Sequence, residues 1–277
     1  MVYRHAEAPF SKFVLSFHMA LFFIASGYLY NEFCINSAGD YYKYVVRKIK
    51  SLWIPYVLFN GCFIALQNLF IRFNVYTDNP EFLIKYPGRY ATLTMPLNFV
   101  EAIKELVKIV LFQGGTQLGG ALWFLQSLFY ISCGYALINY MLKRINMQST
   151  EYIHLIISIV FLIVGYMMGL KEIHALGSGR FFSYYILFHI GVLFKKNKLE
   201  ETLSFLATKY KIVLFIAGVA FLWGAYYRFN IEIVNNRYVN PIVLLSSIAG
   251  WIVVSVCAIN IKRKSNVLTS LLSYVSK

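Results

Sequence analysis

The sequence predicts an all-α fold, a polytopic integral membrane helical bundle with about seven transmembrane helices. Apolar residues make up 59% of the chain and charged residues only 14%, whereas soluble domains carry roughly 25% charged residues. The mean hydropathy is +0.60, and several apolar runs approach the roughly 20 residues that cross a bilayer. Because no Gly/Ser-rich or Pro-rich linker, repeat or low-complexity tract divides the chain, residues 1–277 are predicted to form one membrane domain.

Seven apolar segments are the predicted spans. In chain order they are Phe13–Tyr30, Leu52–Phe73, Ala121–Leu142, Tyr152–Leu170, Phe181–Phe194, Ile212–Phe229 and Pro241–Ile261. A further segment, Val100–Phe112, alternates charged with apolar residues, which is typical of an amphipathic helix lying at a membrane surface. The glycine pairs at 114–115 and 119–120 are expected to break the chain before the third span.

Basic residues gather in alternate connections between these spans, which predicts that those connections are cytoplasmic. They are Lys43, Arg47, Lys48 and Lys50; Lys143 and Arg144; Lys195, Lys196, Lys198, Lys209 and Lys211; and Lys262, Arg263 and Lys264. The opposite connections, 74–120, 171–180 and 230–240, would face outside. The net charge of +14 therefore requires no nucleic acid, and membrane lipids with anionic headgroups are the expected partners of the lysine-rich surface.

The first predicted span contains an ionisable residue, His18, and a small polar residue, Ser26. A charged group in hydrocarbon costs roughly 2–3 kcal/mol on insertion scales, so it usually faces protein or a pathway. His18, Phe22, Ser26 and Tyr30 recur every four residues and therefore share one helix face. Two interpretations stay open, because such a face can be a helix-packing seam or part of a reactive site.

Three short motifs occur in order along this chain. Residues 22–29 read F-F-x-x-S-G-x-L, residues 47–56 read R-K-I-K-S-L-W-I-P-Y, and residues 121–129 read A-L-W-F-L-Q-S-L-F. In this order they resemble the membrane acyltransferase-3 family, most closely its fucose 4-O-acetylase-like branch. The resemblance implies about ten helices, so the first helix and the last one or two are expected to be missing from this chain. A chain shortened in this way is expected to enter membranes but to have little transferase activity.

The resemblance also implies a chemistry. The family transfers an acyl group, and we expect acetyl-CoA as co-substrate, no bound cofactor, and a bacterial surface polysaccharide or its lipid-linked precursor as acceptor at the inner membrane. His18 is the candidate catalytic base, since a histidine with a pKa near 6.5 is mostly neutral at pH 7; its alternative role is packing. Ser26 and Gly27 are expected to shape the site.

Donor and acceptor contacts follow from the other two motifs. Arg47 and Lys50 are the candidates for binding the donor's phosphates, although membrane topology alone also places basic residues at a cytoplasmic helix end. On the acceptor side, Trp123 and Gln126 share a helix face with Tyr130, and Trp123 could equally be an interface anchor. Arg180, in an outer loop, is a further acceptor-side candidate.

The remaining histidines and the cysteines suggest no metal site. His5 and His154 are predicted to lie at an interface or in solvent. No cysteine pair or zinc-ligand spacing occurs, so neither a metal nor a structural disulfide is expected, and the cysteines are predicted to be buried small apolar residues. They are Cys34, Cys62, Cys133 and Cys257.

Other functions are either excluded or left as alternatives. The chain has no G-x-S-x-G, no phosphate-binding P-loop and no G-x-G-x-x-G after a strand, so soluble hydrolases, nucleotide hydrolases and dinucleotide dehydrogenases have no support. A transporter or flippase for glycan intermediates would share the same composition and charge pattern. An inactive fragment of an acyltransferase is the third possibility.

Overall fold

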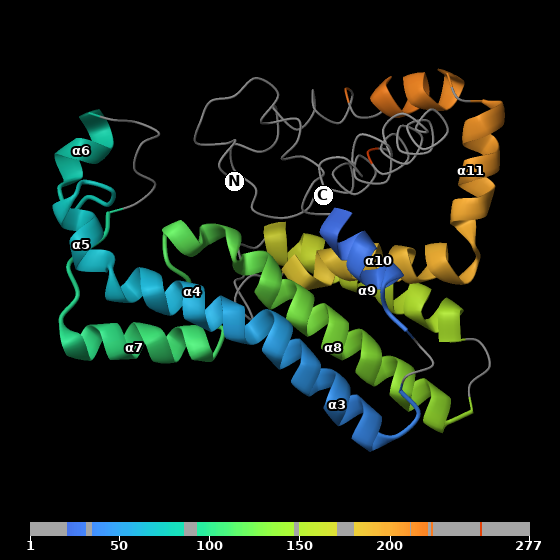
Figure 1. Ribbon diagram of the computed structural model, residues 1–277, viewed down its shortest axis with the longest axis horizontal. Coiled ribbons are helices and arrows are strands. Elements are labelled where there is room, and N and C mark those ends of the chain that lie inside the picture. Colours follow the sequence, from blue (N-terminus) through green and yellow to red (C-terminus); the bar gives the residue numbers. More distant parts are fainter. Residues whose placement is uncertain are drawn as a thin grey trace, which may run out of the picture. The chain divides into compact units, whose positions relative to one another are not determined.

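The computed structural model describes residues 21–31, 35–85, 93–146, 150–170, 180–210 and 212–220, with residues 223 and 250. Within these residues every regular element is a helix (Figure 1), which confirms the all-α prediction for them. The chain divides into two compact units. The α3–α8 unit comprises Glu32–Gln148 and Ile173–Phe181, and the α9–α11 unit comprises Met1–Asn31, Ser149–Glu172 and Phe182–Lys277.

A long helix with a local change of pitch runs through the α3–α8 unit. α3 (Ala38–Lys48) passes into a π-helical turn, η2 (Ile49–Trp53), and then into α4 (Ile54–Ala65), while α5 (Gln67–Arg72) follows after one residue. Pro55 explains the π turn, because proline has no N–H to donate and its ring clashes with the carbonyl four residues earlier. The Ile54 N–H bonds the Ile49 carbonyl, five residues back, which widens the turn ahead of the proline.

Two helices of this unit begin with a capping box. At α3 the Asp40 N–H donates to Ser37 Oγ at 3.1 Å, and the Ser37 N–H donates to Asp40 Oδ2 at 3.1 Å. At α7 (Phe99–Val110) the same exchange joins Asn98 and Glu101, with both bonds at 2.9 Å. Each box satisfies N–H groups that a helix start leaves without a partner. The sequence therefore marks both helix starts, although α3 lies in a segment expected to be a connection.

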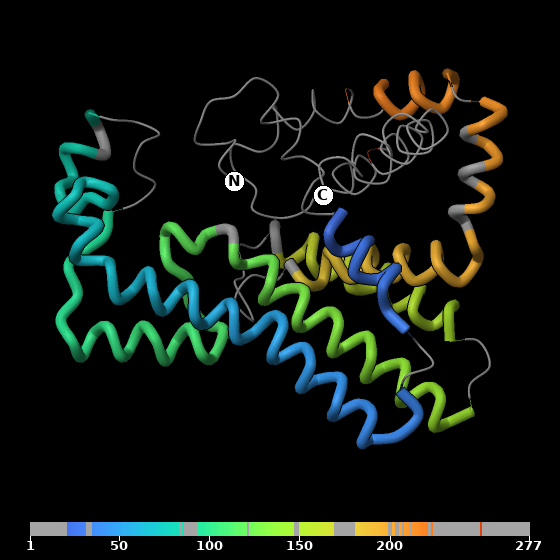
Figure 2. The backbone as a smooth tube through the Cα atoms, in the orientation of Figure 1, coloured from blue at the N-terminus to red at the C-terminus, as the bar shows by residue number. Residues whose placement is uncertain are grey.

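α7 and α8 pack on opposite halves of the long helix (Figure 2). α7 runs antiparallel to α4 and α5, and α8 (Trp123–Arg144) runs antiparallel to α3, where Lys143 Nζ donates to the Ile35 carbonyl at 3.4 Å. A core of Tyr56, Ile64, Ile109 and Phe112 lies between α4 and α7. The short helices α6 (Pro80–Lys85) and η3 (Leu118–Ala121) complete the unit.

The α9–α11 unit is built around an antiparallel pair, α9 (Thr150–Leu170) and α10 (Arg180–Lys196). An ion pair of 2.5 Å between Lys196 and Glu151 joins one end of the pair, and near the other end Gly165 lies against Ser183. Helical residues 21–28 pack on α10. α11 (Leu199–Lys209) follows α10 in a segment that was expected to be a connection, and residues 212–220 are helical.

The structure confirms several of the predicted helices, whereas their placement in a membrane stays a prediction. α8, α9 and α10 agree with three expected spans to within a few residues, and α7 agrees with the expected amphipathic helix. Among the described residues, two helices are long and apolar enough to cross a membrane, namely Leu118–Arg144 and Thr150–Met168. Pro241–Ile261, except residue 250, and the first part of Phe13–Tyr30 lie outside the described residues. The number of seven spans and the single domain therefore stay predictions.

Candidate functional site

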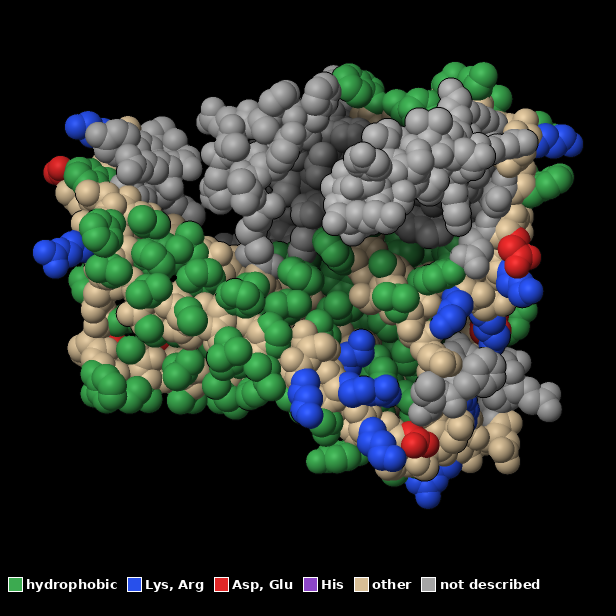
Figure 3. All heavy atoms as spheres, in the orientation of Figure 1, with side chains coloured by type: hydrophobic (Ala, Val, Ile, Leu, Met, Phe, Trp, Pro, Cys, Tyr) green, Lys and Arg blue, Asp and Glu red, His purple; other side chains and the backbone are tan. Residues whose placement is uncertain are grey.

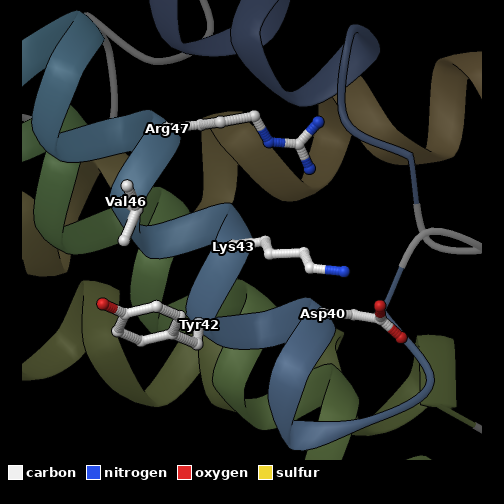
Figure 4. A pocket seen from close by; sticks show the side chains of 5 residues that line it. All are labelled: Asp40, Tyr42, Lys43, Val46 and Arg47. Carbon is white, nitrogen blue, oxygen red and sulfur yellow. The ribbon is translucent and has the colours of Figure 1, made fainter.

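The exposed face of α3 borders a cavity of about 420 Å³. Its lining residues are Asp40, Tyr42, Lys43, Val46 and Arg47. In Figure 4 the Lys43 and Arg47 side chains extend toward the same side of the helix, and Tyr42 and Val46 lie at the other edge. Two cations beside an aromatic and an aliphatic side chain suit an anionic ligand that also carries a flat apolar group.

The charges of this cavity are set by α3 itself. Asp40 accepts a hydrogen bond of 2.8 Å from the Ser37 hydroxyl, and this bond holds the pKa of the Asp40 carboxyl below its usual value of 3.8. At neutral pH the cavity is therefore anionic at its Asp40 end and cationic at Lys43 and Arg47. Lys48 is less suited to a ligand, because it is partly buried, and this burial lowers the pKa of its ammonium group. The same ammonium group lies 5.3 Å from the Tyr44 ring centroid.

Of the two predicted donor-binding residues, the structure places only Arg47 at the cavity. Arg47 lies in the last turn of α3 and lines the cavity, whereas Lys50 is exposed in the π-helical turn and is not one of the described lining residues. Lys43, four residues before Arg47, stands in line with it on the regular part of the helix. Sequence reasoning treated Lys43 only as a topology signal, although the spacing of four residues already put it on the Arg47 face.

Gly27 is a packing position. A Cβ at Gly27 would lie 1.9 Å from the Phe188 carbonyl oxygen, and a Cβ at Gly191 would lie 2.0 Å from the Ile24 carbonyl oxygen. Residues 21–28 and α10 thus touch through their backbones, a contact that small residues permit. Ser26 is partly exposed beside this seam. His18, the candidate base, lies outside the described residues.

The acceptor-side candidates occupy different environments. Gln126 is buried, and its Nε2 donates to the Phe112 carbonyl at 2.7 Å, so it holds the turn that follows α7. Trp123 is partly buried at the start of α8, and the Tyr130 ring lies 5.2 Å from the Phe112 ring and 6.1 Å from the Phe181 ring. Arg180 begins α10, and its side chain lies outside the described part of the structure.

Sequence reasoning missed a buried amide, Asn60, that organises the glycine-rich turn before α8. Asn60 is 0% exposed, and its Oδ1 accepts from the Thr116 N–H at 3.1 Å and from the Thr116 hydroxyl at 2.9 Å. Tyr56 donates its hydroxyl to the Gly114 carbonyl. No sequence signal could have paired Asn60 with Thr116, because the two residues are 56 positions apart. The turn expected to break the chain is therefore an ordered, hydrogen-bonded element.

A second buried polar cluster joins α9 to α10. His154 is only 2% exposed, so the prediction that it lies at an interface or in solvent is wrong. Its Nδ1 is 2.9 Å from the Tyr185 hydroxyl, and its ring lies 5.8 Å from the His189 ring, centroid to centroid. Ser158 Oγ donates to the His154 carbonyl at 2.6 Å. The spacing of His154 and Ser158, four residues apart in a predicted span, was the signal for this inward-facing stripe.

The cysteines are divided. Cys133 is buried in α8, as predicted, whereas Cys62 is exposed on α4, which corrects the expectation that it is buried. Cys34 and Cys257 lie outside the described residues. Among the residues that the structure describes, no group of three His, Cys, Asp or Glu side chains is placed to hold a metal ion.

Comparison with known proteins identifies the class. The acyltransferase-3 family model, described as an acyltransferase domain, matches residues 1–277. The chain therefore belongs to this family, whose members are membrane-associated acyltransferases. No curated protein and no solved structure matches the chain.

Proposed function

We propose that this protein is a membrane O-acyltransferase of the bacterial plasma membrane. It would move an acetyl group from acetyl-CoA to a hydroxyl of a surface polysaccharide or of its lipid-linked precursor. The observation that supports a CoA donor is the α3 cavity, which contains Arg47 of the family-like second motif. Coenzyme A combines phosphates with a flat adenine, and the cavity offers cations beside an aromatic edge.

Each side chain of the cavity has a proposed role. The planar guanidinium of Arg47 can bind two phosphate oxygens at once, while the ammonium of Lys43 supplies a second, compact charge. Tyr42 is exposed at the other edge and can stack on the adenine ring. Lys50, one turn further along, would contribute long-range attraction to the phosphates rather than a direct contact.

The transfer itself needs a base on the acceptor side. The acceptor hydroxyl oxygen attacks the thioester carbonyl, the carbon–sulfur bond breaks, and the hydroxyl proton ends on the departing CoA thiolate. We propose His18 as the base that first takes this proton. Ser26 and Gly27 would shape the site. Trp123, Gln126 and Arg180 are the proposed acceptor-side residues.

Donor binding to the purified protein tests the proposal directly. Arg47→Ala should weaken acetyl-CoA binding by roughly 1.5–3 kcal/mol, the range for hydrogen bonds to charged groups, and Lys43→Ala should weaken it less. Lys104→Ala, which removes a cation of α7, is the matched control and should leave affinity unchanged. Equal affinity of Arg47→Ala and wild type would mean that Arg47 does not bind the donor and only reflects membrane topology.

The acceptor is tested in cells. A deletion strain should lose an acetyl-sized mass increment from its surface glycan, and complementation with the full-length gene should restore it. Accumulation of unmodified lipid-linked precursor on the cytoplasmic side would instead identify a flippase.

A further inference from the structure

The position of α7 is incompatible with one of the two membrane assignments made from sequence. Trp53 Nε1 donates to the Val110 carbonyl at 3.1 Å, and the Asn68 Nδ2 donates to the Leu97 carbonyl at 2.8 Å. These contacts hold α7 antiparallel to α4 and α5 along its whole length. If Leu52–Phe73 crosses the bilayer, α7 cannot lie flat on the membrane surface, because it points along the same axis.

Three faces of α7 follow from its helical spacing of about 100° per residue. Ala102 and Ile109 pack toward α4. The polar face carries two acids and two bases, with Lys108 Nζ 2.6 Å from Glu105 Oε1. The third face is apolar and exposed, and the Phe99 residue is 81% exposed. The residues of this third face are Phe99, Val100, Ile103, Val107 and Val110.

α4 and α5 extend the exposed apolar face. Leu58 on α4 is 62% exposed, and Phe73, which follows α5, is 67% exposed. Figure 3 shows hydrophobic side chains over α4, α5 and α7, whereas Lys and Arg side chains gather over α3. We call this the α4–α7 apolar surface, formed by Leu58, Phe59, Leu66, Leu69, Phe73, Phe99, Val100, Ile103, Val107 and Val110.

We propose that the hydrocarbon of the lipid bilayer covers the α4–α7 apolar surface, and that α7 is a membrane-embedded half-span. Its 12 residues make a helix of about 18 Å, which is roughly half of the 30 Å hydrocarbon thickness. Its Val110 end, bonded to Trp53, lies at the edge of the hydrocarbon beside the ordered turn held by Asn60 and Gln126, and its Asn98 end lies about 18 Å further along α4. The polar face of α7, with equal numbers of acids and bases, is left for water or protein.

The edge of this surface supports lipid as the occupant. At η2 the exposed residues change from charged, on α3, to apolar, on α4. The Trp53 indole, partly exposed and bonded to α7, lies at this change, and Lys48 and Lys50 stand just before it. An amphipathic aromatic ring next to lysines is typical of a membrane–water interface. The same boundary leaves α3 and its cavity on the aqueous side.

Fluorescence quenching in lipid nanodiscs tests the proposal. Bimane would be attached to Ile103→Cys or Val107→Cys on the apolar face, and to the matched polar-face controls Lys104→Cys and Lys108→Cys, in the full chain with its native cysteines replaced. Tyr42→Cys on α3 serves as the aqueous reference. We expect lipids brominated deep in their acyl chains to quench positions 103 and 107 at least three-fold more than positions 104 and 108. Iodide should quench position 42 best.

Each other result would overturn the proposal. Quenching of positions 103 and 107 only by lipids brominated near the headgroup would mean that α7 lies at the surface. Strong quenching by iodide would place the α4–α7 apolar surface in water. Protection from both quenchers, with cross-linking between copies through position 103, would identify a second copy as the occupant. Because all substituted residues are exposed, correct folding is checked by unchanged thermal unfolding, and Val100→Cys replaces any variant that fails this check.

Discussion

The two units pack their polar backbone groups in different ways. In the α9–α11 unit, residues 21–28 approach α10 so closely at Gly27 and Gly191 that side chains are excluded. In the α3–α8 unit, the turn before α8 is held by side chains, with Asn60 and Gln126 bound to backbone groups of residues 112–116. One seam depends on the absence of atoms and the other on specific donors and acceptors.

This difference sets how each seam should respond to substitution. A glycine contact fails when any atom is added, because backbone atoms cannot move aside as a flexible side chain can. An amide contact fails when an atom is removed, since a buried donor or acceptor then has no partner. The substitutions below test these two responses, beginning with the largest expected effect.

Gly27→Ala should be the most destabilising substitution. The added methyl would lie 1.9 Å from the Phe188 carbonyl oxygen, so the two helices must separate, at a cost of about 3 kcal/mol in the free energy of unfolding. Gly191→Ala should behave alike, because the contact is reciprocal. Gly134→Ala, in α8 with nothing within 4 Å of the new atom, should be neutral or stabilise by about 0.5–1 kcal/mol. Thermal unfolding in detergent measures all three, and equal stability of Gly27→Ala and Gly134→Ala would contradict the seam.

Asn60→Ala should cost about 2 kcal/mol, within the range for leaving buried polar groups without partners. It removes the acceptor of the Thr116 N–H and hydroxyl. Asn68→Ala in α5 is the matched control, because Asn68 also makes two hydrogen bonds to the backbone but is exposed. Water can replace its bonds, so it should cost less than Asn60→Ala by at least 1 kcal/mol. Chemical denaturation of both variants checks the order, and a reversed order would show that burial does not set the cost.

The sequence predicted the elements whose signals are local. The apolar runs of α8, α9 and α10 gave these helices within a few residues, and one face of the first expected span was interpreted as either a helix-packing seam or part of a reactive site. Contacts between distant residues were out of reach, since nothing local pairs Asn60 with Thr116 or His154 with Tyr185. α3 and α11 are helices within segments that were expected to connect spans, and Ser37 and Asp40 form a capping box at the start of α3.

The site was predictable in part for the same reason. Arg47 came from a motif, and its neighbour in the cavity, Lys43, came only with the regular helix of α3. Lys50 was placed on the Arg47 face by assuming an unbroken α-helix, whereas the structure has Lys50 in a π turn and not among the described residues that line the cavity. A proline eight residues after Arg47 is visible in the sequence, but whether a helix answers it with a kink, a π turn or an end depends on its packing.

Tyr185→Phe should destabilise the α9–α11 unit by about 1 kcal/mol. It deletes the hydroxyl that lies 2.9 Å from His154 Nδ1, and the net value of such a hydrogen bond is roughly 0.5–1.5 kcal/mol. Tyr166→Phe on the exposed side of α9 is the control and should change stability by less than about 0.5 kcal/mol. Thermal unfolding of the two variants checks this, and identical curves would mean that the histidine cluster does not contribute to the α9–α10 contact.

The smallest effect should come from Asp40, the exposed counterpart of Asn60, because both side chains hold backbone N–H groups. The hydrogen bond from Ser37 keeps the Asp40 pKa in the folded protein below 3.8, its usual value. A carboxyl with a lowered folded pKa stabilises the fold fully above its unfolded pKa, and this contribution is lost as the pH falls through the folded value. The stability difference between wild type and Asp40→Asn should therefore stay constant from about pH 7 to pH 5 and shrink below about pH 4. Asp78→Asn, an exposed carboxylate outside both capping boxes, controls for net charge. Hydrogen exchange of the first turn of α3 measures the difference, and a loss that is already complete near pH 6 would show that Asp40 does not cap this helix.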